Sequence, residues 1–197
     1  AAQEEFPVSI IGPINPGVKK AIAHTENNRV GVIATEGTIA SGAYQSALKE
    51  TEPAVKIFSQ ACPKFVSLVE AGELHSERTV EVARGYLGSL KENEIDTLLL
   101  GCTHFPYLAE VIQEVIGNSV RLIYPGYSIA LQAKEILQAK KLLSPKGRGK
   151  VTFYVSDLAH VSGRFVKLGK KFLNFKELGF KELDLWAQRS DVEAEFY

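Results

Sequence analysis

The sequence contains no methionine, a single tryptophan and only two cysteines, Cys62 and Cys102. These cysteines lack the close pairing of a zinc site, so we expect no metal and two reduced thiols. Lys and Arg together number 23, as do Asp and Glu, which leaves no global field to attract nucleic acid or an anionic membrane. No apolar run approaches membrane-spanning length and no signal peptide is visible. We therefore expect a cytoplasmic protein that binds neither nucleic acid nor a membrane.

The chain has 197 residues, enough to bury a substantial core in one large or two small domains. Apolar runs predict strands at residues 7–12, 29–35, 54–59, 97–100, 120–124, 151–155 and 183–186. Helical periodicity predicts helices at residues 17–24, 38–50, 76–90, 108–116, 127–143 and 158–172, with Thr38 and Ser76 as N-caps of two of them. This alternation predicts an α/β fold whose parallel sheet has right-handed crossovers.

The segment Ser144–Lys150 is the one stretch that resembles a linker, and we place a boundary near it. Its basic side chains could contact a phosphate group or could simply be a solvated loop. The polar tail at residues 187–197 is expected to fray.

Cys102 follows the predicted strand at 97–100 directly and precedes a predicted helix. Ligands of open α/β sheets collect at the carboxyl ends of strands, and the N–H groups of a helix N-terminus favour a thiolate. The alternative is that Cys102 is a small buried hydrophobic residue, as most free cysteines are. Its position, with Thr103 and His104 directly after it, favours a chemical role.

Three segments together resemble glutamate racemase: residues 32–38 (VIATEGT), 61–70 (ACPKFVSLVE) and 100–106 (LGCTHFP). The Gly-Cys-Thr-His-aromatic-Pro motif is the most specific of the three, and the resemblance extends from about Pro7 to about Leu185. It implies two similar three-layer α/β/α lobes with the substrate between them, and neither pyridoxal phosphate nor a metal. Residues 7–125 would form one complete lobe, and residues 126–197 would complete the other.

The resemblance also implies roles for individual residues. Racemisation needs two acid–base groups on opposite faces of the α-carbon, and a thiolate is a base whose pKa the surroundings can tune. By resemblance, Cys102 is one of these groups and His104 assists its proton transfer. Thr103, Thr35 and Thr38, together with His104, would bind the amino acid. Glu70 matches a family acid that orients His104, although it could equally be a surface carboxylate.

The chain departs from the family pattern in two places. It has neither the Asp-Ser segment nor the Ala-Cys-Asn-Thr motif that supplies the second thiol, so the chain reads as the carboxyl-terminal part of a larger protein. Relatives carry a cysteine at the Cys62 position without using it as the opposing base, and a buried structural role is the alternative we favour for it. Tyr124, Pro125 and Gly126 stand where relatives have an aspartate and a small residue. In the family, the chain from Gly126 onwards would fold back onto the first lobe, so without the partner strands of that lobe its apolar surface is expected to be exposed.

The leading hypothesis is a cofactor-independent glutamate racemase that makes D-glutamate for peptidoglycan, its partner being the small-molecule substrate. This chain alone is then expected to be inactive, because the first cysteine is absent. The alternative is a racemase-like domain that binds an amino acid or a protein without turnover. The sequence leaves open whether the protein forms a homodimer.

Overall fold

The computed structural model describes residues 2–144, 149 and 151–184, which form two compact units, Ala1–Leu143 and Ser144–Tyr197. Most of the predicted linker, Trp186 and the predicted frayed tail lie outside the described residues. None of the helices in the described part of the chain is long and apolar enough to cross a membrane.

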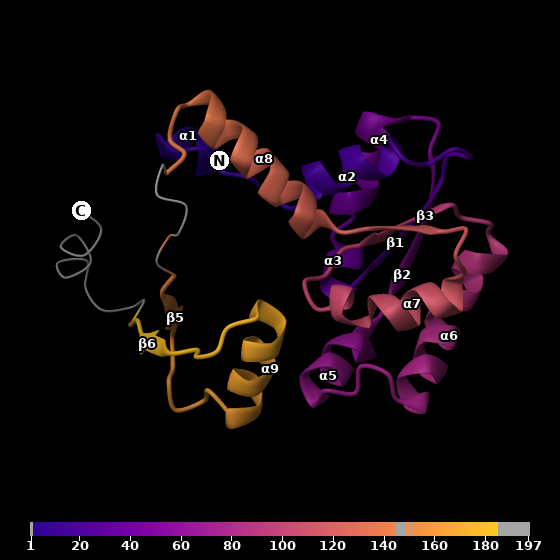
Figure 1. Cartoon of the computed structure of the whole chain (residues 1–197). Helices are drawn as coiled ribbons and strands as arrows, with labels where there is room; N and C mark the ends of the chain where they lie inside the picture. The colour runs from indigo at the N-terminus through magenta and orange to yellow at the C-terminus, as the bar shows by residue number, and fades with distance from the viewer. Residues whose placement is uncertain (1, 145–148, 150, 185–197) are drawn as a thin grey trace. The chain divides into compact units, whose positions relative to one another are not determined.

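The first unit is built on a four-stranded sheet in the order β2-β1-β3-β4, and every neighbouring pair is parallel (Figure 1). Its strands are β1 (Arg29–Ala34), β2 (Lys56–Ala61), β3 (Thr97–Leu100) and β4 (Arg121–Ile123). The two central strands, β1 and β3, carry the near-continuous apolar runs that a sheet covered on both faces requires. The predicted α/β fold with a parallel sheet is confirmed.

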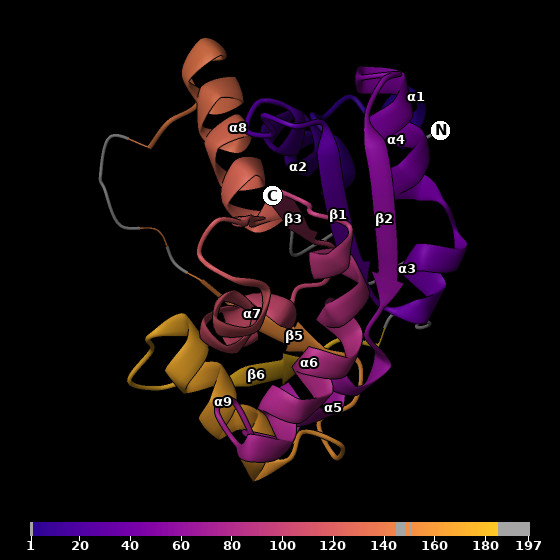
Figure 2. The same ribbon diagram turned by 90° about the vertical axis from the view of Figure 1, so that its right-hand side faces the viewer.

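Helices cover both faces of this sheet, giving three layers (Figures 1 and 2). On one face lie α2 (Ile14–Ile22), α4 (Ala43–Thr51) and α8 (Pro125–Ala139), and on the other α5 (Pro63–Ala71), α6 (Glu77–Glu92) and α7 (Ala109–Ile116). Three short helices complete the unit: α1 (Ala2–Glu5), α3 (Glu36–Ala40) and the 3-10 helix η1 (Phe105–Leu108). Ser76 caps α6 as predicted, since its side chain accepts a hydrogen bond from the Thr79 N–H.

A hydrophobic core fills each space between sheet and helices. Under α2 and α4 the buried residues are Val18, Ala21, Val30, Val32, Tyr44, Leu48, Val55, Leu99 and Ile123. Under α5 and η1, the rings of Phe65 and Phe105 meet edge to face with centroids 5.2 Å apart. Each fully buried side chain of this size stabilises the fold by about 1.5–3 kcal/mol. The core therefore fixes the carboxyl ends of β1, β2 and β3 in place.

The helix α8 belongs to the first unit, because α2 and α8 pack together where Gly17 meets Pro125. A Cβ at Gly17 would lie 3.1 Å from the Pro125 Cγ, so only glycine allows this approach without displacement. The compact unit ends at Leu143. Outward-facing apolar side chains of α8, such as Tyr127 and Leu131, are exposed.

Asp96 ties the loop before β1 to the start of β3. Its carboxylate accepts hydrogen bonds from the Thr25 hydroxyl (2.7 Å) and from the main-chain N–H groups of Glu26 (2.7 Å) and Asn27 (2.8 Å). Partial burial of Asp96 opposes ionisation, but these hydrogen bonds outweigh it and hold the pKa of the carboxyl below its usual value. The amino-terminal edge of the sheet is thus held by a charged side chain.

Three sequence predictions for this unit are wrong: a strand at residues 7–12, Thr38 as an N-cap, and an undivided helix at residues 38–50. Residues 7–12 form no strand, and Val8 and Ile10 are exposed; none of the strands that the structure describes pairs with this apolar run. Thr38 is not an N-cap but lies inside α3, whose N-cap position is occupied by Thr35. The predicted helix at 38–50 is divided because Gly42 adopts a left-handed conformation with φ of 66°, which ends one helix before the next begins.

The second unit is a strand–helix–strand motif. Parallel strands β5 (Phe153–Val155) and β6 (Phe180–Glu182) are connected through α9 (Gly163–Leu173), which Ser162 caps. The last strand therefore precedes the predicted residues 183–186. The second unit holds together through a cluster of phenylalanine rings, with neighbouring centroids 5.7–6.1 Å apart, formed by Phe153, Phe165, Phe175 and Phe180. Apolar side chains of this unit, Phe165 among them, remain exposed, as expected for the chain after Gly126.

Candidate functional site

The carboxyl ends of the three neighbouring strands bring both cysteines beside Thr35. The N–H of Gly101 donates to the Ile33 carbonyl (2.7 Å), and the N–H of Cys62 donates to the Ala34 carbonyl (2.9 Å). The ladders end at the pairs Ala34–Ala61 and Ile33–Leu100, so Cys62 and Cys102 follow the ends of the two strands that flank β1. Segments far apart in the sequence thus converge on one edge of the sheet, where ligands of parallel sheets bind.

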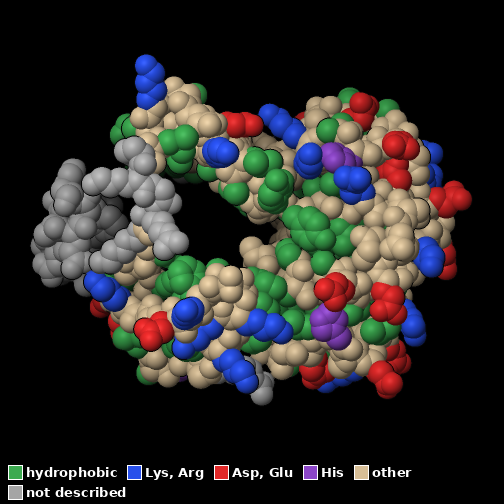
Figure 3. All heavy atoms as spheres, in the orientation of Figure 1, with side chains coloured by type: hydrophobic (Ala, Val, Ile, Leu, Met, Phe, Trp, Pro, Cys, Tyr) green, Lys and Arg blue, Asp and Glu red, His purple; other side chains and the backbone are tan. Residues whose placement is uncertain are grey.

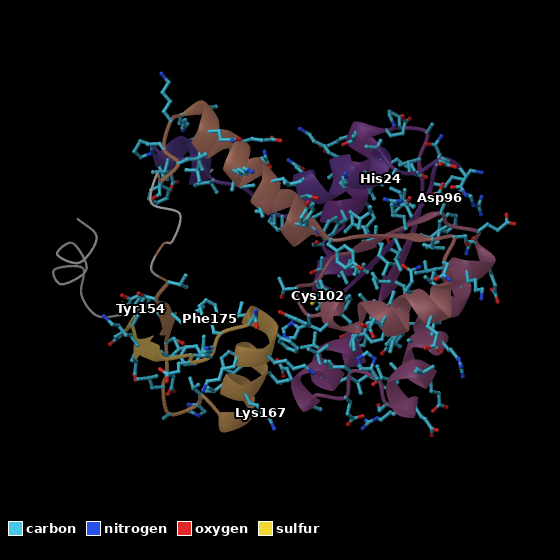
Figure 4. All side chains as sticks on the ribbon, in the orientation of Figure 1. His24, Asp96, Cys102, Tyr154, Lys167 and Phe175 are labelled. Atoms are coloured by element: carbon cyan, nitrogen blue, oxygen red, sulfur yellow. The ribbon has the colours of Figure 1, made fainter. Side chains whose placement is uncertain are left out.

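Cys102 lies in the turn that joins β3 to η1, and its side chain is half-buried. The turn is anchored on both sides: Gly101 packs against β1, and the N–H of Phe105 donates to the Cys102 carbonyl (3.3 Å). Phe105 itself is fully buried. The thiol is therefore held at the carboxyl edge of the sheet, at the opposite end of β3 from Asp96 (Figure 4).

His104 and Glu70 form a pair at this edge. The Nε2 atom of His104 lies 3.4 Å from Oε1 of Glu70, which is close enough for an ion pair when the imidazole is protonated. The side chains are 34% and 64% exposed, so the pair adds little to stability but can orient the ring. The structure thus brings together two residues that the sequence predicted to act together.

The predicted threonines lie on two different segments. The hydroxyl groups of Thr35 and Thr38 share a hydrogen bond of 3.0 Å at the start of α3, directly after β1. Thr103 is exposed and follows Cys102 in the same turn. All six predicted site residues therefore occur on or directly after elements at the carboxyl side of the sheet, and their individual roles stay predictions.

Cys62 differs sharply from Cys102 because it is completely buried. Burial, and to a lesser extent the negative charge of Cys102, raises the pKa of the Cys62 thiol to about 12. Its Sγ donates to the Gln60 carbonyl at 3.7 Å. At neutral pH Cys62 is therefore a protonated, inaccessible thiol, which can serve neither as base nor as nucleophile.

Tyr44 is a residue at this edge that sequence reasoning did not single out. Burial, and then the charge of Cys102, raises the pKa of its hydroxyl. In the sequence it is one of several apolar positions of α4, all of which read as core. The only available signal was its place shortly after the Thr35–Thr38 segment.

Elsewhere the first unit holds an open, polar cavity of about 490 Å³ beside Asp96 and Arg121. Asp96 lies at the other end of the sheet from Cys102 (Figure 4). Acidic and basic side chains are interspersed over this unit's visible surface (Figure 3). Among the described residues, no group of three or more His, Cys, Asp or Glu side chains is arranged to hold a metal ion. The candidate acid–base groups are therefore Cys102 itself and the His104–Glu70 pair.

Comparisons with known proteins point to one family. Residues 1–133 match the family model described as Asp/Glu/Hydantoin racemase. The glutamate racemase of Geobacter metallireducens is 40% identical over 190 residues, which cover 96% of this chain and 69% of the relative. That of Bacillus cereus is 45% identical over 142 residues, covering 72% of this chain and 53% of the relative.

Solved structures of glutamate racemases also resemble this chain. Glutamate racemase isoform RacE1 from Bacillus anthracis superimposes with a TM-score of 0.85 at 32% identity, covering 93% of this chain and 68% of that one. The Francisella tularensis glutamate racemase, solved in complex with D-glutamate, gives 0.82 at 30% identity, covering 92% and 66%. This chain spans between 53% and 69% of the length of these four relatives. With its parallel sheet and the cysteine turn at its carboxyl edge, the chain belongs to the Asp/Glu/Hydantoin racemase family.

Proposed function

We propose that this chain carries one half of the acid–base machinery of a glutamate racemase, which interconverts L- and D-glutamate without a cofactor. The observation that carries the proposal is a half-exposed Cys102 in the turn after β3, followed by His104, whose ring lies 3.4 Å from the Glu70 carboxylate. The names of the relatives support glutamate as the substrate. The D-glutamate formed would serve peptidoglycan synthesis in the cytoplasm.

In this proposal the Cys102 thiolate removes the α-proton of glutamate. The C–H bond breaks, its electron pair stays on the α-carbon, and the proton forms the S–H bond. His104, oriented by Glu70, would keep Cys102 in the thiolate form before transfer and assist the return of a proton. The hydroxyl groups of Thr35, Thr38 and Thr103 would hold the amino acid at the strand ends.

Inversion also needs a second acid on the opposite face of the α-carbon. Cys62 is the other cysteine of the chain, and it is buried with a pKa of about 12. We therefore propose that Cys62 is structural and that this chain by itself exchanges the α-proton on one face without efficient racemisation.

The test is to incubate the purified chain with L-glutamate in deuterated water and to follow the α-proton signal by NMR. We expect deuterium to enter the α-position, with little D-glutamate on chiral chromatography. Cys102→Ala and Cys102→Ser should abolish exchange, whereas the matched variant Cys62→Ala should retain it. Exchange that persists in Cys102→Ala, or rapid racemisation by the chain, would overturn the proposal.

The alternative, binding without turnover, is favoured by one observation: only one of the two thiols is accessible. It predicts that calorimetry detects glutamate binding while the NMR experiment detects no exchange. That combination would replace the enzymatic proposal with the binding one.

A further inference from the structure

The helix α9 of the second unit presents a lysine face, formed by Lys167, Lys170 and Lys171. These residues are three and four positions apart, so they lie on the same side of the 11-residue helix. Lys167 and Lys171 are exposed, and Lys170 is half-buried. The sequence of α9 contains no Asp or Glu. The even balance of charge over the whole chain thus conceals a concentrated positive charge on one helix.

The lysine face is the outer face of α9, because the opposite face packs inside the second unit. The ring of Phe165 meets that of Phe180 in β6, with centroids 5.8 Å apart. Gly169 also lies close to Leu178, since a Cβ at Gly169 would stand 2.7 Å from the Cδ2 atom of that leucine. Figure 4 shows Lys167 on the side of α9 that points away from β5 and β6. The lysine side chains are therefore free to meet another surface.

The charge of this face is not neutralised within the part of the chain that the structure describes. The three lysine ammonium groups take part in no ion pair and no hydrogen bond with any described residue. Acidic side chains of the same unit have other partners. Asp157 pairs with His160 at 2.6 Å, and Glu182 accepts a hydrogen bond from the main-chain N–H of Leu158 (3.3 Å). The lysine face therefore suits an external anionic partner.

An apolar side chain borders the lysine face. Leu173 lies three residues after Lys170, so the two side chains are neighbours on the helix surface, and Leu173 is 46% exposed. The phosphates of a nucleic acid would neutralise the lysines but leave this leucine in water. The interface of an anionic bilayer accepts both, because ammonium groups stay among the headgroups while apolar side chains reach the acyl boundary.

We propose that the lysine face of α9 is a binding surface for a membrane that contains anionic lipids. The ammonium groups contact the lipid phosphates, and Leu173 enters the boundary between headgroups and acyl chains. The expectation that this chain binds no membrane rests on its total charge. A bilayer instead responds to the charge of the face that it meets, because charges farther away than about 8–10 Å are screened by salt.

The test is co-sedimentation of the purified chain with vesicles of phosphatidylcholine alone, or of phosphatidylcholine and phosphatidylglycerol in equal amounts. We expect binding to the second kind only, and release when NaCl is raised to about 0.5 M. Each lysine at an anionic surface strengthens binding by a factor of about five. The triple variant Lys167→Gln, Lys170→Gln, Lys171→Gln should therefore bind roughly a hundredfold more weakly.

A matched triple variant removes the same charge from exposed lysines that are scattered over α2, β2 and α6: Lys20→Gln, Lys56→Gln, Lys91→Gln. It should retain vesicle binding, and circular dichroism checks that both triple variants are folded. Equal loss in the two triple variants would show that net charge alone acts, and it would overturn the proposal. Sedimentation with neither kind of vesicle would overturn it as well.

Leu173→Asn separates a membrane from a nucleic acid. It keeps the lysines and removes the apolar contact, so vesicle binding should weaken several-fold. Vesicle binding as tight as that of the wild type, together with displacement of the chain from the vesicles by a DNA duplex, would assign the lysine face to nucleic acid and overturn the proposal. Vesicle binding needs no glutamate, so its outcome is independent of whether the chain exchanges the α-proton.

Discussion

The Asp96 carboxylate should be a major source of stability, which Asp96→Ala tests. The variant loses one hydroxyl and two main-chain donors, bound at 2.7–2.8 Å. Hydrogen bonds to a charged group contribute about 1.5–3 kcal/mol each when protected from water, and less at a solvated edge such as this one. We expect a total loss of about 2–4 kcal/mol, which for a chain of this length lowers Tm by about 5–15 °C.

The loss of stability in Asp96→Ala should depend on pH in a defined direction. Because the pKa of Asp96 is lower in the folded than in the unfolded protein, its contribution is complete above the unfolded value of about 3.9. It is lost as the pH falls through the still lower folded value. The difference in Tm between wild type and Asp96→Ala should therefore be full at pH 7 and should narrow in acid.

Differential scanning calorimetry between pH 3 and pH 7 measures both effects. Glu26→Ala is a matched control, since it removes a neighbouring exposed carboxylate but keeps the main-chain N–H that binds Asp96. It should change the free energy of unfolding by less than about 0.5 kcal/mol. An Asp96→Ala protein that melts with the wild type at pH 7, or whose deficit is the same in acid, would refute the reasoning.

Three further predictions concern labelling, capping and the imidazole pair. Iodoacetamide at pH 8 should add one group, at Cys102, because a thiol with a pKa of about 12 is ionised to only about one part in ten thousand. Ser76→Ala should destabilise the first unit by about 1 kcal/mol in urea unfolding, since it removes the cap of α6. Glu70→Gln should slow α-proton exchange by roughly tenfold, because His104 loses the carboxylate that orients it, while Tm stays unchanged.

Each of these has a direct check. Labelling in concentrated urea should add two groups, and a second group in native buffer would contradict the burial of Cys62. Ser89→Ala, an exposed serine in the same helix, should cost less than the capping variant. Full exchange activity in Glu70→Gln would show that His104 needs no orienting partner.

The sequence predicted the strands of the sheet well where consecutive residues of a strand are buried. The strand before Cys102 and the Ser76 cap were both recognisable, because a run of buried aliphatic residues and a capping serine act locally. The local apolar pattern was misleading at residues 7–12, which pair with none of the described strands. The division of the helix at Gly42 depends on a backbone conformation that the surrounding fold selects.

The site was predictable as a set of residues but not as a geometry. The His104–Glu70 pair follows from the resemblance, yet its 3.4 Å separation depends on how α5 and η1 pack. Tyr44 could not be separated from the core residues around it, because its contact with Gly101 joins residues more than fifty positions apart. Long-range contacts of this kind leave no local pattern.

The position of the cysteines on either side of β1 has a consequence for oxidation. Two strand spacings separate their backbones by roughly 10 Å, whereas a disulfide needs Cα atoms within about 7 Å. Peroxide therefore cannot form a disulfide between Cys62 and Cys102 within one folded molecule, and only the half-exposed thiol of Cys102 is left to react. Oxidised samples should accordingly contain sulfenic acid at Cys102 or covalent pairs of molecules joined through it, both of which a reducing agent reverses.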